Sequence, residues 1–408
     1  MSLWGPAAFA AVCILSLSTT AAGRRAASAP ALLMLAGAAL SLFYRAVELP
    51  FAPMEAMAGA AEAGLAALAF ASAAQFRVSR FAGRCPAAFR LTIGGAPLFL
   101  LVCSLAAFVL LPQLTLASAL LLGAALMING AAFDRRAVIN APAPAEIKAA
   151  VRLESAAIIA FGAPVAVLLA ALATSPGAHE PAAGPLLQAS LGVLKGFALG
   201  GAIGLGVARF GNALRRRTRT AMQRADGKFA IAAGVVSFAV AKLVGGDALI
   251  AALSAGLLWG EETGALTSSR LRLRRAVEQG VAPAAYFAFG CLFAPRILQA
   301  DLLSIVFAVA AVTVMRAGPR LAILQTPSLP RESQAFLAWF GGAPGAASAL
   351  FLMMLFGNAA LVDQDAILTV GALAVAAGVI AARLTSRPLA NAFLRQRALA
   401  AKRRFYAS

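Results

Sequence analysis

The sequence is poor in charge, and it contains almost no residues of the types that bind metals. Only 12% of its 408 residues are charged, against roughly 25% in soluble domains. It has a single histidine, His179, which excludes a histidine cluster as a metal site or a catalytic base. The four cysteines share no paired spacing and predict neither a disulfide framework nor a metal site: Cys13, Cys85, Cys103 and Cys291. No phosphate-binding loop, paired-histidine motif or nucleophile elbow occurs. We therefore predict no cofactor and no enzymatic activity.

Apolar residues dominate instead. They make up 61% of the chain, and the mean hydropathy is +0.84. Because the apolar runs are continuous rather than alternating, they predict membrane-spanning helices, not a barrel. Crossing a membrane takes about 20 apolar residues, and reading the runs between breaks gives about thirteen spans. Their expected ranges are 3–21, 30–47, 56–75, 90–111, 114–133, 153–173, 186–208, 228–243, 247–260, 281–295, 301–324, 335–356 and 366–384.

The charges that do occur are unevenly placed. The net charge is +19, and nearly all lysines and arginines follow odd-numbered predicted helices; Arg316 and Arg320 are counted with the loop charges after the eleventh. Cytoplasmic loops accumulate positive charge, so we expect a multi-pass cell-membrane protein with its N-terminus outside and its C-terminus in the cytoplasm. We expect a transmembrane domain over 1–384 and a basic tail over 385–408. Because the charge is divided among short loops, the expected partner is anionic lipid headgroups and not a nucleic acid.

The first apolar stretch, from Leu3 to Thr20, has no basic residue before it, whereas Arg24 and Arg25 follow it. This order favours a retained first helix over a cleaved signal peptide.

Two predicted spans are interrupted at corresponding places. The fifth contains Asn129 and Gly130, and the twelfth contains Gly341, Gly342 and Pro344. Glycine and proline interrupt the hydrogen-bond ladder of a helix. Paired interruptions in two halves of a chain indicate the midplane site of a secondary transporter. The alternative is that these glycines allow close helix packing, as the spacing of the glycines at 196, 200 and 204 predicts for the seventh span.

Several segments resemble the monovalent cation:proton antiporter family, the sodium/hydrogen exchangers. The resemblance is carried by Gly245-Gly246 followed by an apolar run ending in Ala255-Gly256-Leu257, by residues 336–341 and by residues 121–126. It implies an all-helical fold of inverted repeats with two crossed discontinuous helices, working as an elevator in a homodimer. It also implies exchange of sodium or potassium for protons.

The chain departs from this family at three polar motifs. The family has Thr-Asp-Pro at the early break, where this chain has Asn129-Gly130-Ala131. The family's Asn-Asp pair, whose aspartate carries the cation and the proton, aligns with Ile158 and Ile159. At the late break the family's Pro-Arg-Gly is replaced by residues 343–345, Ala-Pro-Gly. The usual carrier is therefore missing.

Glu154 is the leading remaining candidate for an ion or proton site. It is open to three interpretations: an acid at a helix N-terminus, a relocated ligand acting with Asn129, or a member of a structural ion pair. Lys195 also lies within an apolar run and is a second candidate. Glu62 is expected to pack or pair, Lys242 to reach the headgroups, and Asp247 to form an interhelical turn.

The favoured function is therefore monovalent cation:proton antiport. One rival is a transport-inactive relative that serves as a membrane partner or regulator, and the loss of the three motifs favours it. The other rival is a transporter of a different, anionic solute, which buried lysines and helix N-termini would favour.

Overall fold

The computed structural model describes most of the chain, and its described part is helical. The described ranges are 30–46, 54–75, 77–128, 145–175, 184–217, 219–263, 267–325 and 329–407. Within them there is no strand, and a single antiparallel bridge joins Thr174 to Leu361. The expected first span, 3–21, lies outside the described residues, as do Asn129 and Gly130.

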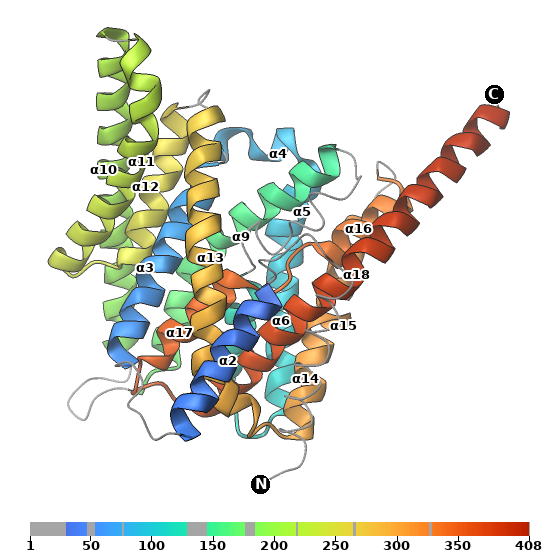
Figure 1. Ribbon diagram of the computed structural model, residues 1–408. Coiled ribbons are helices and arrows are strands. Elements are labelled where there is room, and N and C mark those ends of the chain that lie inside the picture. The colour runs from blue at the N-terminus through green and yellow to red at the C-terminus, as the bar shows by residue number, and fades with distance from the viewer. Residues whose placement is uncertain are drawn as a thin grey trace.

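The helices are arranged as an elongated bundle, and the α10–α11 hairpin and the end of α18 project from it (Figure 1). The first half comprises α2 (Pro30–Ala46), α3 (Met54–Ala73), η1 (Val78–Arg80), α4 (Phe81–Arg84), α5 (Pro86–Arg90), η2 (Leu91–Gly95), α6 (Ala96–Leu110), α7 (Leu116–Met127) and α9 (Ala145–Leu172). The second half comprises α10 (Gly184–Arg217), α11 (Arg219–Val244), α12 (Ala248–Thr263), α13 (Thr267–Ile297), α14 (Leu302–Val312), α15 (Val314–Leu324), α16 (Arg331–Phe340), α17 (Ala346–Phe356) and α18 (Gln364–Ala407).

Seven described segments are long and apolar enough to cross a membrane by length and composition. Four shorter apolar helices accompany them, among them Leu116–Met127 and Ala346–Phe356, the two that end or begin at the expected breaks. The prediction of an all-helical membrane protein is confirmed. The expected count of thirteen spans is not, because several predicted ranges divide or extend differently.

Helix ends differ from the expected ones where polar helix formers flank an apolar run. Helix α9 begins at Ala145 rather than at 153, and α18 continues past 384 to Ala407. Alanine, glutamate, lysine, glutamine and arginine favour helix as strongly as apolar residues do, so hydropathy alone stops too early. The predicted span 301–324 is divided at Thr313, whose φ of −110° and ψ of −91° end α14.

The interior is one large cluster of buried side chains, and aromatic residues are its largest members. Trp259 of α12 lies 6.4 Å from Phe70 of α3, measured between ring centroids. Phe293 of α13 lies 6.0 Å from Phe356 of α17, again between ring centroids. These contacts link helices that are far apart in sequence and fix their relative positions.

Helix α10 crosses α12 at very short range along three glycines. A Cβ atom added at Gly196 would lie 2.6 Å from the carbonyl oxygen of Asp247. At Gly200 and Gly204 it would overlap the backbone oxygens of Ala251 and Ala255. Association of helices in a bilayer depends on packing at this range, because lipid tails are as apolar as the helices. The small-residue spacing of α10 thus has the packing role that the sequence predicts.

We expect Gly200→Ala to lower the stability of the purified protein. The added methyl group overlaps the α12 backbone, which cannot rotate away, and overpacking of this kind costs about 1–3 kcal/mol. Thermal unfolding in mild detergent measures the effect. Gly206→Ala is the matched control, because a Cβ at Gly206 on the same helix meets nothing within 4 Å. Equal midpoints for the two variants would contradict the tight crossing.

Candidate functional site

The late break is a short non-helical segment between α16 and α17. Helix α16 ends at Phe340, and Gly341 takes an extended conformation with φ −80° and ψ 156°. Gly342 has φ +67°, a left-handed value that side chains other than glycine rarely adopt. Pro344 follows, and α17 begins at Ala346. The glycines and the proline singled out in the sequence therefore occupy the interruption.

The early helix ends close to this segment. Helix α7 stops at Met127, and Ile128 is extended with ψ 97°. The Ser348 hydroxyl in the first turn of α17 donates a hydrogen bond to the Ile128 carbonyl, and both residues are fully buried. The end of the described part of the early helix thus meets the beginning of the half-helix that follows the late break.

A buried ion pair lies against the late break. Both terminal nitrogens of Arg320, on α15, donate to the carboxylate of Glu154, on α9; the Nη2–Oε2 distance is 2.8 Å. Arg320 is 3% exposed and Glu154 is 0% exposed. A two-point contact between guanidinium and carboxylate is among the strongest hydrogen-bonded pairs in proteins. It also places both charges out of contact with solvent.

Arg320 has a second set of partners at the end of α16. Its Nε donates to the carbonyl oxygen of Ala338 at 3.1 Å, and its Nη2 donates to that of Leu337 at 2.9 Å. The Leu337 carbonyl also accepts the Gly341 N–H at 3.0 Å, and the last carbonyls of a helix carry partial negative charge. The guanidinium therefore satisfies the end of α16 and the Glu154 carboxylate at once.

The two glycines of the break make room for this pair. A Cβ atom at Gly341 would overlap Arg320 Nη2 and lie 2.6 Å from Glu154 Oε2. At Gly342 it would lie 2.6 Å from Arg320 Nη1. The backbone of the break therefore passes directly over the ion pair, which explains why glycine is needed at both positions.

Two sequence expectations about this site are corrected. Glu154 is not in the first turn of its helix, because α9 begins nine residues earlier at Ala145. Of its three interpretations, the structure shows an ion pair. Arg320 and Arg316 were counted among the cytoplasmic loop charges, yet both are 3% exposed and lie within α15. Arg320 could have been identified from the sequence, because it is a basic residue inside a predicted apolar span. Glu154, an acid in another apolar span, requires a basic partner of this kind.

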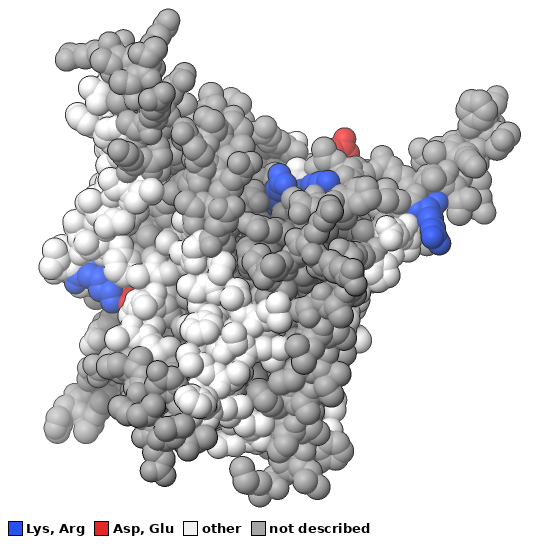
Figure 2. Space-filling model, viewed as in Figure 1, with Lys and Arg blue, Asp and Glu red and all other residues white. Residues whose placement is uncertain are grey.

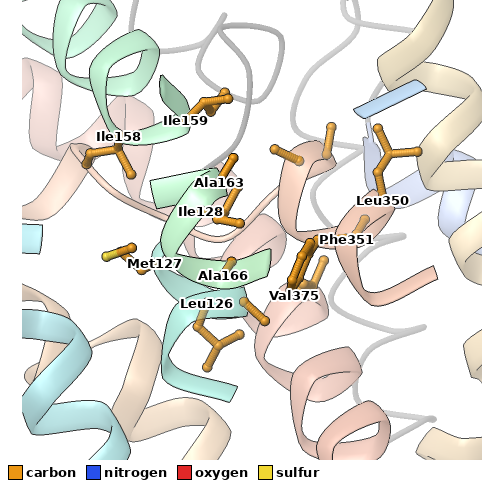
Figure 3. Packing of buried hydrophobic residues seen from close by; sticks show 14 of the residues in the cluster. Leu126, Met127, Ile128, Ile158, Ile159, Ala163, Ala166, Leu350, Phe351 and Val375 are labelled. Atoms are coloured by element: carbon orange, nitrogen blue, oxygen red, sulfur yellow. The ribbon is translucent and has the colours of Figure 1, made fainter. Parts of the chain in front are cut away.

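The positions of the family's carrier pair are apolar and buried. Ile158 and Ile159, one turn after Glu154 on α9, are 3% and 1% exposed. Figure 3 shows Ile158 on the side of Met127, the last residue of α7, whereas Ile159 lies on the other side of α9. The two positions at which the family carries its ion therefore hold buried hydrocarbon side chains.

The remaining charged candidates lie away from the ion pair. Lys195 is exposed on α10 and borders the α11–α12 turn, so the structure does not bring it to Glu154. Lys242 of α11 pairs with Glu62 of α3 at 2.6 Å. Asp247 lies in the α11–α12 turn, where its carboxylate accepts the N–H of Ile250 at 2.8 Å. No group of three or more metal-ligating side chains occurs among the described residues.

We predict that the effects of removing Glu154 and Arg320 on the free energy of unfolding are not additive. Arg320→Met leaves the Glu154 carboxylate buried without its partner and should cost about 3–5 kcal/mol. The double variant Glu154→Gln with Arg320→Met removes both charges and should recover much of that loss. Unfolding midpoints of the single and double variants in detergent measure this difference.

The matched control for that measurement is the partly exposed pair Lys242–Glu62. Breaking it with Lys242→Met should cost only about 0–1 kcal/mol. If Arg320→Met is no more costly than Lys242→Met, Glu154 and Arg320 do not form the buried pair described.

The comparisons with known proteins agree with this architecture. The profile of the transmembrane sodium/hydrogen exchanger family matches residues 8–392. The structure is similar to that of a sodium proton antiporter from Methanocaldococcus jannaschii, with a TM-score of 0.69 and 14% sequence identity. The match covers 95% of this chain and 98% of that one. No curated protein sequence matches the chain.

Proposed function

The chain belongs to the sodium/hydrogen exchanger family, and from that premise we propose that it exchanges a monovalent cation for a proton with Glu154 as the alternating site. The family is a class of membrane transporters, whose activity is cation:proton antiport, and the fold is that of an antiporter. The observation that carries the proposal is the Glu154 carboxylate, which lies directly beneath the late break.

Exchange requires a group that is neutralised in turn by a proton and by a cation. Within the described ranges, Glu154 is the acid whose whole residue is buried, and it lies where the half-helices approach each other. Because Glu154 has no access to solvent, its negative charge has to be balanced by a group inside the protein, whether that group is a proton, a cation or a basic side chain. In the structure that balance comes from Arg320.

Release of Glu154 leaves Arg320 with partners. The carbonyls of Leu337 and Ala338 hold the guanidinium from the end of α16, and their partial negative charge favours a cation there. Glu154 can then accept a proton or a monovalent cation while Arg320 remains bound to α16. Because the guanidinium has a second set of acceptors, Glu154 can exchange Arg320 for a proton or a cation. The carboxylate of an isolated buried ion pair could not do so without leaving its partner uncompensated.

Orientation, direction and assembly follow from the same proposal. We place the ends of α10 and α13 that carry the clusters 215–217 and 270–275 on the cytoplasmic side of the cell membrane. The N-terminus is then outside and the C-terminal segment 385–408 inside. Sodium or potassium leaves and protons enter, and the unit is a homodimer, as the family resemblance implies.

A transport-inactive relative is the second candidate, and one observation favours it. Ile158 and Ile159 fill the carrier positions, and the only fully buried described acid is already paired. Such a chain would keep the antiporter fold and serve as a membrane partner or regulator. The anionic-solute alternative loses the support of a buried lysine, because Lys195 is exposed.

We expect Glu154→Gln to abolish cation-driven proton movement. Purified protein in liposomes containing a pH indicator is exposed to a step of Na⁺, K⁺ or Li⁺, and internal pH is followed. The wild type should move protons with at least one of these cations, because Glu154 alternates between cation and proton. Glutamine keeps the shape of the side chain but cannot carry either charge, so the signal should fall to background.

Glu62→Gln is the control for that assay, since it removes an acid of the same type from the α3–α11 pair and should leave exchange intact. Glu154→Asp should retain part of the signal. A correctly inserted wild type that responds to no cation supports the inactive alternative. Exchange by Glu154→Gln at the wild-type rate would rule out Glu154 as the site.

We predict that restoring the family's motif strengthens exchange. The double variant Ile158→Asn with Ile159→Asp places a carboxylate at position 159, where the side chain is 1% exposed. A buried carboxylate there has to bind a proton or a cation, so the vesicle signal should exceed that of the wild type. Ile158→Asn with Ile159→Asn is the uncharged control and should show no gain. Equal signals from the two variants would contradict a carrier site at this position of α9.

A further inference from the structure

The outward face of α10 and α11 is apolar over several turns. On α10, Leu187, Leu191 and Leu194 are 62%, 49% and 64% exposed, and on α11 Val235 and Leu243 are 62% and 86% exposed. In a membrane-spanning chain, side chains of this kind on an outer face meet lipid.

Two lysines interrupt this face at one place. Lys195 is exposed on α10, in the same stripe as the leucines, and the Lys242 side chain is 52% exposed near the end of α11. Both border the α11–α12 turn, because a Cβ atom at Gly246 would lie 3.3 Å from that of Lys195. Figure 2 shows basic side chains with an acid beside them at the left edge of the molecule.

The acids near these lysines already have partners. Glu62 pairs with Lys242 at 2.6 Å. The Asp247 carboxylate caps α12 through the N–H of Ile250 at 2.8 Å, and the Asp247 N–H donates to the Gly192 carbonyl, one turn before Lys195, at 2.9 Å. Within the described part of the chain Lys195 forms no ion pair. An ammonium group on an apolar membrane face requires an anion.

We propose that the phosphate of an acidic phospholipid binds at the lysine site, defined as Lys195 and Lys242 beside the α11–α12 turn. The acyl chains of that lipid lie along the exposed leucines and valines of α10 and α11. A lysine near a membrane surface attracts anionic lipid by about 1 kcal/mol.

Lipid titration of the full-length protein in mild detergent tests the site without reference to transport. Phosphatidylglycerol should raise the thermal midpoint of the wild type more than phosphatidylcholine does, and native mass spectrometry should show it retained. Lys195→Gln should weaken phosphatidylglycerol binding about fivefold, the contribution of one lysine near an anionic lipid. Lys195→Arg should keep it.

Arg209→Gln is the matched control, since Arg209 is an exposed base on the same helix with a side chain that is 68% exposed. It should bind phosphatidylglycerol as the wild type does. The proposal fails if Lys195→Gln retains the full preference, or if the wild type has none. It also fails if inorganic phosphate alone reproduces the shift, which would identify a site for a small anion. Because no arm measures exchange, the result is separate from the transport assay.

Discussion

The two-point contact between Glu154 and Arg320 is the interaction on which the centre of the molecule depends. It joins α9 to α15, and the same guanidinium holds the last carbonyls of α16. The non-helical backbone at Gly341 and Gly342 then closes over the pair. Interrupted backbone is tolerated at membrane depth only where protein or water satisfies its polar groups, and here a single arginine side chain satisfies part of that need.

The polar part of the site, Glu154 with Arg320, lies next to an apolar part. One turn beyond Glu154, the positions where the family carries its ion are buried isoleucines. Three charged residues are buried in the described core: Glu154 and Arg320 form this pair, and the Arg316 guanidinium lies 5.5 Å from the ring centroid of Trp339. Any exchange through this core has to compete with Arg320 for Glu154, and the carbonyls of α16 make such competition physically possible.

The sequence was informative where a single physical cause determines the structure. Continuous apolar runs predicted membrane helices, glycine spacing predicted the close approach of α10 to α12, and glycine with proline predicted the break before α17. Each of these features follows from local composition. The site was less predictable because it depends on which distant residues meet. Arg320 was assigned to a loop by its charge, although burial within α15 is what gives it its role.

The position of helix ends was the second feature that limited prediction from the sequence. Glu154 stood at the expected start of an apolar run, and the polar residues before it concealed the extra turns of α9. An acid in the first turn can be explained by the helix dipole alone, whereas an acid nine residues into a helix cannot. The partner of Glu154 could therefore be recognised only once the position of α15 beside α9 was known.

Backbone hydrogen exchange across residues 337–345 tests the central claim most directly. If Arg320 and Glu154 hold the break closed, the amides of this segment are protected in the wild type. Exchange measured by mass spectrometry should then become much faster in Glu154→Gln, while α10 and α12 keep their protection. Unchanged protection of residues 337–345 in that variant would contradict the account, because the break would then be held by something other than the ion pair.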